Sequence, residues 1–96
     1  MYFGLIIKEL RNKEGLTLTE LAAKLKLDSA NLSKIENNKR EFDEKRLELL
    51  ADIFKIDLEY LKTEYYSDRL AKIVVRSNCS LEVFKMAENK MGYFKK

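Results

Sequence analysis

Histidine and proline are both missing from this sequence of 96 residues, and glycine and cysteine are rare. Without histidine the chain lacks the commonest general base, the usual zinc ligand and every histidine-dependent triad. Gly4, Gly15 and Gly92 are too scattered to form a glycine-rich phosphate loop. Carboxylates are plentiful, but they stand beside Lys and Arg at helical spacing, which is typical of solvated surface pairs. We therefore predict no enzymatic activity, no metal site and no cofactor.

Long apolar segments are missing too. No run approaches the roughly 18 apolar residues that a membrane-spanning helix needs, so we expect no membrane partner. The single cysteine, Cys79, excludes an internal disulfide framework. A chain of this kind fits the reducing cytoplasm, and we expect Cys79 to be buried as a small apolar side chain.

The lack of proline makes helix the default structure, and apolar residues repeat at helical spacing. A first helix is predicted over residues 2–14, with Gly15 as its stop. Side chains that cap helix N-termini predict where the next four helices begin. They are Thr17 (in a capping box with Glu20), Asp28, Asp43 and Asp57. Asn38 suits the end of the third helix. The sequence therefore predicts five short helices in one compact bundle that ends near Leu61.

The third predicted helix, residues 29–36, carries the clearest functional pattern. Leu32 and Ile35 share its core-facing side. The other side chains at the front of the helix are small, polar or basic: Ser29, Ala30, Asn31, Ser33 and Lys34. A polar and basic loop follows, with Asn37, Lys39 and Arg40. Such a surface suits a helix in the DNA major groove, with base edges on the helix and phosphates on the loop.

Two segments carry a family resemblance, IKELRNKEGLTLTELAAKLKLDSANLSKIENNKR and FDEKRLELLADIFKIDLEYL. Over residues 3–62 they resemble the Cro/phage-repressor (XRE-like) helix-turn-helix family. The resemblance implies an all-α, five-helix lambda-repressor-like bundle over residues 1–63, with a helical extension over 64–96. It also implies that Thr17 and Thr19 lie at the start of the helix that crosses the DNA backbone. Arg11 and Glu36 match a family ion pair.

The sequence departs from the family pattern at two positions. Leu18 stands where the family usually has a polar residue that contacts the DNA backbone. Lys26 stands where the family usually has glycine in the turn between the second and third helices. A lysine there must either adopt a positive φ or belong to a turn of a different kind.

The extension contains two apolar stripes, Leu70-Ile73-Val74 and Val83-Phe84-Ala87-Met91, on either side of a polar break at Ser77-Asn78. We expect the second stripe to lie on a helix that begins near Ser80 and ends at Gly92. Two interpretations remain open: the stripes pack on the fifth helix, or they form a homodimer interface. The extension also resembles regulators encoded beside bacterial DNA methyltransferases and restriction enzymes.

The sequence thus predicts a transcriptional regulator that binds double-stranded DNA. It would bind a palindromic operator as a homodimer, with no small-molecule effector. The alternative is a protein-interaction module of the antitoxin type that acts through its C-terminal helices.

Overall fold

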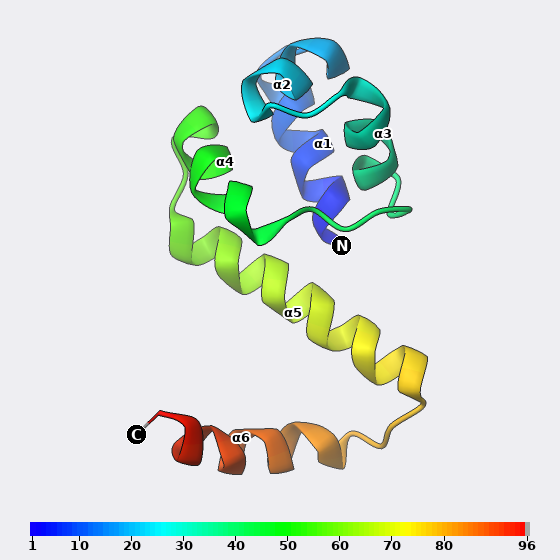
Figure 1. Ribbon diagram of the computed structural model, residues 1–96, viewed down its shortest axis with the longest axis vertical. Helices are drawn as coiled ribbons and strands as arrows, with labels where there is room; N and C mark the ends of the chain where they lie inside the picture. The colour runs from blue at the N-terminus through cyan, green and yellow to red at the C-terminus, as the bar shows by residue number, and fades with distance from the viewer. Residues whose placement is uncertain (96) are drawn as a thin grey trace. The chain divides into compact units, whose positions relative to one another are not determined.

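The computed structural model describes residues 1–95. All the secondary structure in that range is helical, and it contains no strand. The helices are α1 (Phe3–Lys13), α2 (Leu18–Leu25), α3 (Ser29–Glu36), α4 (Leu47–Phe54), α5 (Leu58–Ser77) and α6 (Glu82–Phe94). A short 3₁₀ turn, Glu44–Arg46, leads into α4. This confirms the all-α fold class (Figure 1). No helix within residues 1–95 has both the length and the apolar character needed to cross a bilayer.

The chain divides into two compact units, Met1–Tyr65 and the residues from Tyr66 onward. The prediction that the fifth helix is short and ends near Leu61 is wrong. Instead, α5 continues without a break to Ser77 and absorbs the first apolar stripe of the extension. No glycine or proline occurs between Leu58 and Ser77, so nothing in the local sequence stops the helix.

One apolar core holds the first unit together, and each of its five helices contributes buried side chains to it. α3 packs against both α1 and α2, and the loop after α3 crosses to α4 (Figure 1). Phe3, Phe42 and Tyr65 close one end of this core, with the ring of Phe3 centred 5.7 Å from Phe42 and 5.2 Å from Tyr65. The Tyr65 hydroxyl donates a hydrogen bond to the Phe42 carbonyl oxygen. Tyr65 thereby satisfies a polar group that the core would otherwise bury unpaired.

The helices α1 to α5 all end in the same way. A residue with positive φ follows each helix: Gly15, Lys26, Asn38, Lys55 and Asn78. The N–H of the next residue then bonds back to a carbonyl five residues earlier, for example Leu27 to Ala22 at 2.9 Å and Lys39 to Lys34 at 2.8 Å. This is the Schellman motif. The stops at Gly15 and Asn38 are confirmed, and Lys26 adopts the positive φ of 60° that the first of its two alternatives requires.

The N-terminal caps are confirmed for α2 and α3 but not for α4. Thr17 and Glu20 form both hydrogen bonds of the capping box, and Asp28 accepts the N–H of Asn31 at 2.7 Å. Asp43 makes no side-chain cap. Its carboxylate is bound by Arg46 instead, so a 3₁₀ turn precedes α4, which begins only at Leu47.

The second unit buries none of the side chains that the structure describes between Tyr66 and Lys95. Two details differ from the sequence prediction, the place of Gly92 and the exposure of Cys79. Gly92 lies inside α6 and does not end it, because the helix runs on to Phe94. Cys79 is exposed, since it lies in the polar link between α5 and α6. Val83, Phe84 and Met91 are exposed on α6 and have not entered a core.

Candidate nucleic-acid interface

Helices α2 and α3 and the turn between them form a helix-turn-helix. On α3, Leu32 is fully buried and Ile35 nearly so, which fixes the side of the helix that faces the core. The predicted DNA-contacting residues of α3 and its loop are half-buried or exposed, and none of them is buried. Along residues 29–40 only Leu32, Ile35 and Glu36 are buried, and the predicted contact residues are all accessible: Ser29, Ala30, Asn31, Ser33, Lys34, Asn37, Lys39 and Arg40.

The turn before α3 is held by a residue that the sequence analysis missed. Arg46 donates hydrogen bonds to the carbonyl oxygens of Leu25, at 2.7 Å, and Lys26, at 3.1 Å. These carbonyls belong to the C-terminal end of α2, where unpaired acceptors and the helix dipole favour a cation. Asp43 binds the same guanidinium. Arg46 thus stabilises the positive-φ turn at Lys26 and with it the angle at which α3 leaves α2. The charge of Arg46 gave no signal in the sequence, because this contact spans twenty residues.

The far end of α3 is tied to α1. Arg11 binds the Glu36 carboxylate with two hydrogen bonds, Nε to Oε2 at 2.8 Å and Nη2 to Oε1 at 2.9 Å. Only 3% of the Glu36 side chain and 14% of the Arg11 side chain are exposed. Hydrogen bonding to Glu36 is the main cause that raises the pKa of Arg11. The ion pair that the family resemblance implied is therefore present, bidentate and largely buried.

Gly4 allows α1 to approach α3 closely. A Cβ atom at this position would lie 1.9 Å from the carbonyl oxygen of Ile35. The Tyr2 hydroxyl also donates to the Glu36 carbonyl oxygen, at 2.9 Å, at the end of α3. Side-chain periodicity treats Gly4 as a neutral position, so the sequence analysis did not find this contact. Together with the ion pair, it sets the position of α3 on the bundle.

The loop after α3 folds back along the helix. The Asn37 side chain donates to the Ser33 carbonyl oxygen at 2.9 Å, and the Asn38 turn directs the chain toward the start of α3. Arg40 thereby reaches Asn31, and its Nη1 donates to Asn31 Oδ1 at 2.5 Å. The Asn31 amide nitrogen donates in turn to Asp28 Oδ2 at 3.1 Å. The predicted base-contacting Asn31 and the predicted phosphate-contacting Arg40 are therefore direct neighbours.

The two threonines lie at the start of α2, and both are exposed. Thr17 Oγ1 accepts the Glu20 N–H at 3.1 Å, while Glu20 Oε1 accepts the Thr17 N–H at 2.8 Å. This use of the Thr17 hydroxyl as an acceptor leaves its proton to donate elsewhere. The hydrogen bond from the Thr17 backbone is the main cause that lowers the pKa of Glu20. Leu18 is half-buried against the core, which accounts for an apolar residue at this position.

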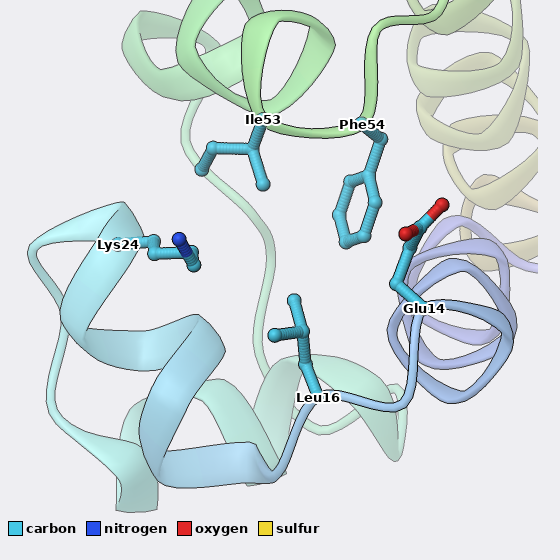
Figure 2. Close-up of a pocket in the computed structure, with 5 residues that line it drawn as sticks. All are labelled: Glu14, Leu16, Lys24, Ile53 and Phe54. Carbon is cyan, nitrogen blue, oxygen red and sulfur yellow. The ribbon is translucent and has the colours of Figure 1, made fainter.

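Two surface cavities of the first unit lie near the helix-turn-helix or beside it. One of about 350 Å³ is lined by Glu14, Leu16, Lys24, Ile53 and Phe54. Figure 2 shows Leu16 pointing into it from the turn after α1, below Phe54 and Ile53 of α4. None of the predicted DNA-contacting residues lines it. The other, of about 210 Å³, includes Asn31, Arg40 and Arg46 in its lining and so belongs to the predicted DNA surface.

A helix-turn-helix with an accessible second helix and a basic loop defines a DNA-binding domain. The pattern of a helix-turn-helix family matches residues 7–61, more than half of the chain, and the chain belongs to this family. No curated protein matches the chain.

Solved structures of transcription regulators share the fold. SinR, a master regulator of biofilm formation solved in complex with DNA, is 30% identical, with a TM-score of 0.55 over 62% of this chain and 95% of its own. The clp gene regulator ClgR from C. glutamicum is 22% identical, with a TM-score of 0.56 over 68% of this chain and 84% of its own. A chain from a SinR–SinI complex is 24% identical, with a TM-score of 0.54 over 97% of this chain and 97% of its own. The chain is thus a DNA-binding regulator of the helix-turn-helix family and not an enzyme.

Proposed function

We propose that this chain is a cytoplasmic transcriptional regulator that binds a palindromic operator in double-stranded DNA as a homodimer. The observation that carries the proposal is the set of accessible side chains between Ser29 and Arg40. Arg46 binds the end of the preceding helix α2, and Arg11 binds Glu36 at the end of α3. Residues 1–63 would form the DNA-binding domain and residues 64–96 the dimerisation extension.

Within this surface we assign two kinds of contact. In α3, Asn31 and its neighbours Ser29, Ala30, Ser33 and Lys34 would face base edges or nearby phosphates. Phosphates would be held by residues at the ends of the motif: Thr17, Thr19, Asn37, Lys39 and Arg40. Support comes from their accessibility and from the 30% identical SinR, whose structure contains DNA.

Titration of a duplex from upstream of the chain's own gene, with excess random duplex as competitor, tests the assignment. Asn31→Ala should lose discrimination at one base position, by about 1–3 kcal/mol. Lys39→Ala should weaken binding to every sequence alike and reduce the slope of log affinity against log salt by about one. If Asn31→Ala weakens specific and random DNA equally, Asn31 does not read a base.

The homodimer is supported by apolar side chains that the single chain leaves exposed. Leu70 and Ile73 on α5 and Phe84 and Met91 on α6 each expose 44% or more of their surface. One α3 offers few side chains for base contacts, whereas two copies about 34 Å apart would read both halves of a palindrome. Burial of the stripes between two copies would contribute about 25 cal/mol per Å² of apolar surface.

Sedimentation of the full-length protein tests the homodimer. Phe84→Asp should shift the protein toward the monomer and reduce its affinity for a palindrome to that for a half-site. Asn89→Asp is the matched control, because it adds the same charge to α6 without removing an apolar side chain. A Phe84→Asp protein that remains dimeric would place the interface elsewhere.

The same exposed side chains favour a second candidate, an interaction module that binds another protein through α5 and α6. SinR, in one of the similar structures, forms a complex with SinI. A purified wild-type protein that sediments as a monomer at all concentrations would support this candidate over the homodimer. Control of a restriction-modification or methyltransferase operon is a narrower proposal, which rests on the resemblance of the extension alone. Specific binding to the promoter of such an operon would test it.

A further inference from the structure

We propose that Asp28 and Arg40 are positioning residues that fix the amide of Asn31 in one orientation and thereby determine which base pair α3 prefers. The inference rests on the proposed DNA-binding surface and extends it from contact to specificity. It gives Arg40 a role beyond the phosphate contact that its sequence position suggests.

The chemistry of the three side chains permits only one orientation of the amide. A carboxylate only accepts hydrogen bonds and a guanidinium only donates them. Asp28 Oδ2 therefore faces Asn31 Nδ2, at 3.1 Å, and Arg40 Nη1 faces Asn31 Oδ1, at 2.5 Å. A flipped amide would place like groups against each other on both sides. The usual ambiguity between the oxygen and nitrogen of an asparagine is thus resolved by its neighbours.

The two contacts leave half of the amide's hydrogen-bonding capacity unused. Asn31 retains one N–H on Nδ2 and one lone pair on Oδ1. A donor and an acceptor in that order match the N7 and N6 groups on the major-groove edge of adenine. A base with a hydrogen-bond donor at the position of adenine N7 would require the reverse arrangement, with the oxygen of the Asn31 amide in the place of its nitrogen. We infer that the fixed amide favours adenine at the base pair it meets.

Asp28 has a second function that must be separated from the first. Its Oδ1 caps α3 by accepting the backbone N–H of Asn31, at 2.7 Å. Asparagine caps helices about as well as aspartate. Asp28→Asn therefore preserves the cap but replaces the Oδ2 acceptor by an NH₂ group, which repels the Asn31 amide nitrogen. The substitution also removes a negative charge close to the predicted phosphate path, which should strengthen binding to random DNA.

The experiment starts from a duplex enriched by the wild-type protein from a pool of random sequences, together with all its single-base-pair variants. Asn31→Ala should reduce discrimination at one base pair by about 5- to 150-fold. Arg40→Ala and Asp28→Asn should reduce discrimination at that same base pair. Their effects on random DNA should be opposite: weaker binding for Arg40→Ala and tighter binding for Asp28→Asn. Lys39→Ala is the control for a phosphate contact alone and should leave discrimination unchanged.

A double substitution decides whether Arg40 acts through Asn31. In the Asn31→Ala background, Arg40→Ala should cause no further loss of discrimination, although its loss of affinity for random DNA should persist. If Arg40→Ala instead weakens all duplexes equally in both backgrounds, Arg40 is a phosphate contact only and the positioning role is overturned. If the wild-type protein enriches no sequence at all, the proposed sequence-specific function fails, and the inference fails with it.

Discussion

The two units of this chain contain similar amphipathic helices but treat their apolar side chains in opposite ways. In Met1–Tyr65, the stripes of α1 to α5 meet in one core, and Ile7, Leu21, Leu25, Leu32, Leu50 and Leu61 are fully buried. From Tyr66 to Lys95, the single chain buries none of its side chains. The large apolar residues exposed there are Tyr66, Leu70, Ile73, Val75, Leu81, Val83, Phe84, Met86, Met91, Tyr93 and Phe94.

This difference shows what the spacing of apolar residues along a helix can predict and what it cannot. A spacing of three and four residues identifies the face of a helix that needs to be covered. It does not identify the surface that packs against this face. In the first unit that surface belongs to the other helices of the same unit. Substitutions in the first unit should therefore change the free energy of unfolding at any protein concentration. Substitutions on the stripes of α6 should act mainly through concentration-dependent association.

Glu36→Ala should cause the largest loss of stability. It leaves the guanidinium of Arg11, whose side chain is only 14% exposed, without its main partner, and breaking one side of a buried ion pair costs about 3–5 kcal/mol. Denaturant unfolding of the variant measures the loss. Arg11→Ala and the double variant complete a thermodynamic cycle. A coupling energy near zero would show that the pair behaves like an exposed one, worth about 0–1 kcal/mol.

Replacing one glycine in each unit by alanine compares the two units directly. Gly4→Ala forces a Cβ against the Ile35 carbonyl oxygen and should cost about 1–3 kcal/mol as α1 and α3 separate. A Cβ at Gly92 meets nothing within 4 Å, and Gly92 lies inside α6. Gly92→Ala should therefore raise the helicity of α6, by about 0.5–1 kcal/mol of helix propensity. Thermal unfolding followed by circular dichroism measures both. Equal effects at the two positions would contradict the contrast between the units.

The elements of the first unit were largely predictable because their signals are local. The capping box at Thr17, the cap at Asp28 and the stop at Gly15 each lie within four residues of the helix end they fix. The length of α5 was not predictable from the family resemblance, which ends where the helix continues. The role of Asp43 was not predictable from local sequence either, because its partner, Arg46, also binds the distant end of α2.

The predicted DNA surface also contains contacts between distant residues that local sequence patterns do not reveal. Residue types and spacing were sufficient to propose Asn31 as a base reader and Arg40 as a phosphate contact. The hydrogen bond between them was not foreseeable, because it depends on how the loop folds back after Asn38. The Arg11–Glu36 pair was found only through the family resemblance, since 25 residues separate its members. The assignment of site residues to DNA and the boundary between the domains stay predictions.

Lys26→Gly should stabilise the first unit, with a smaller change in the free energy of unfolding than Glu36→Ala or Gly4→Ala causes. Lys26 has a φ of 60°, a left-handed conformation that costs a non-glycine residue about 1–2 kcal/mol. Glycine removes this cost but gains flexibility in the unfolded chain, so we expect a net gain of at most about 1 kcal/mol. Lys24→Gly is the matched control, because the same change inside α2 should destabilise by about 1 kcal/mol. Thermal unfolding of both variants provides the measurement, and a loss of stability in Lys26→Gly would show that the lysine side chain itself supports the turn.

The charge of Glu20 should have the smallest effect, visible only in its dependence on pH. Hydrogen bonding to Thr17 lowers the pKa of Glu20 from its ordinary value of 4.5. A carboxyl group with a lowered native pKa stabilises the folded state above its unfolded pKa and loses that contribution as pH falls through the native value. Glu20→Gln can keep the hydrogen bonds of the capping box but cannot ionise. The wild-type protein should therefore be slightly more stable than Glu20→Gln at neutral pH, and the difference should disappear on acidification below 4.5. Melting temperatures of the two proteins across this range measure it. A difference that stays constant at every pH would show that the charge contributes nothing to α2, and that the capping box acts through its hydrogen bonds alone.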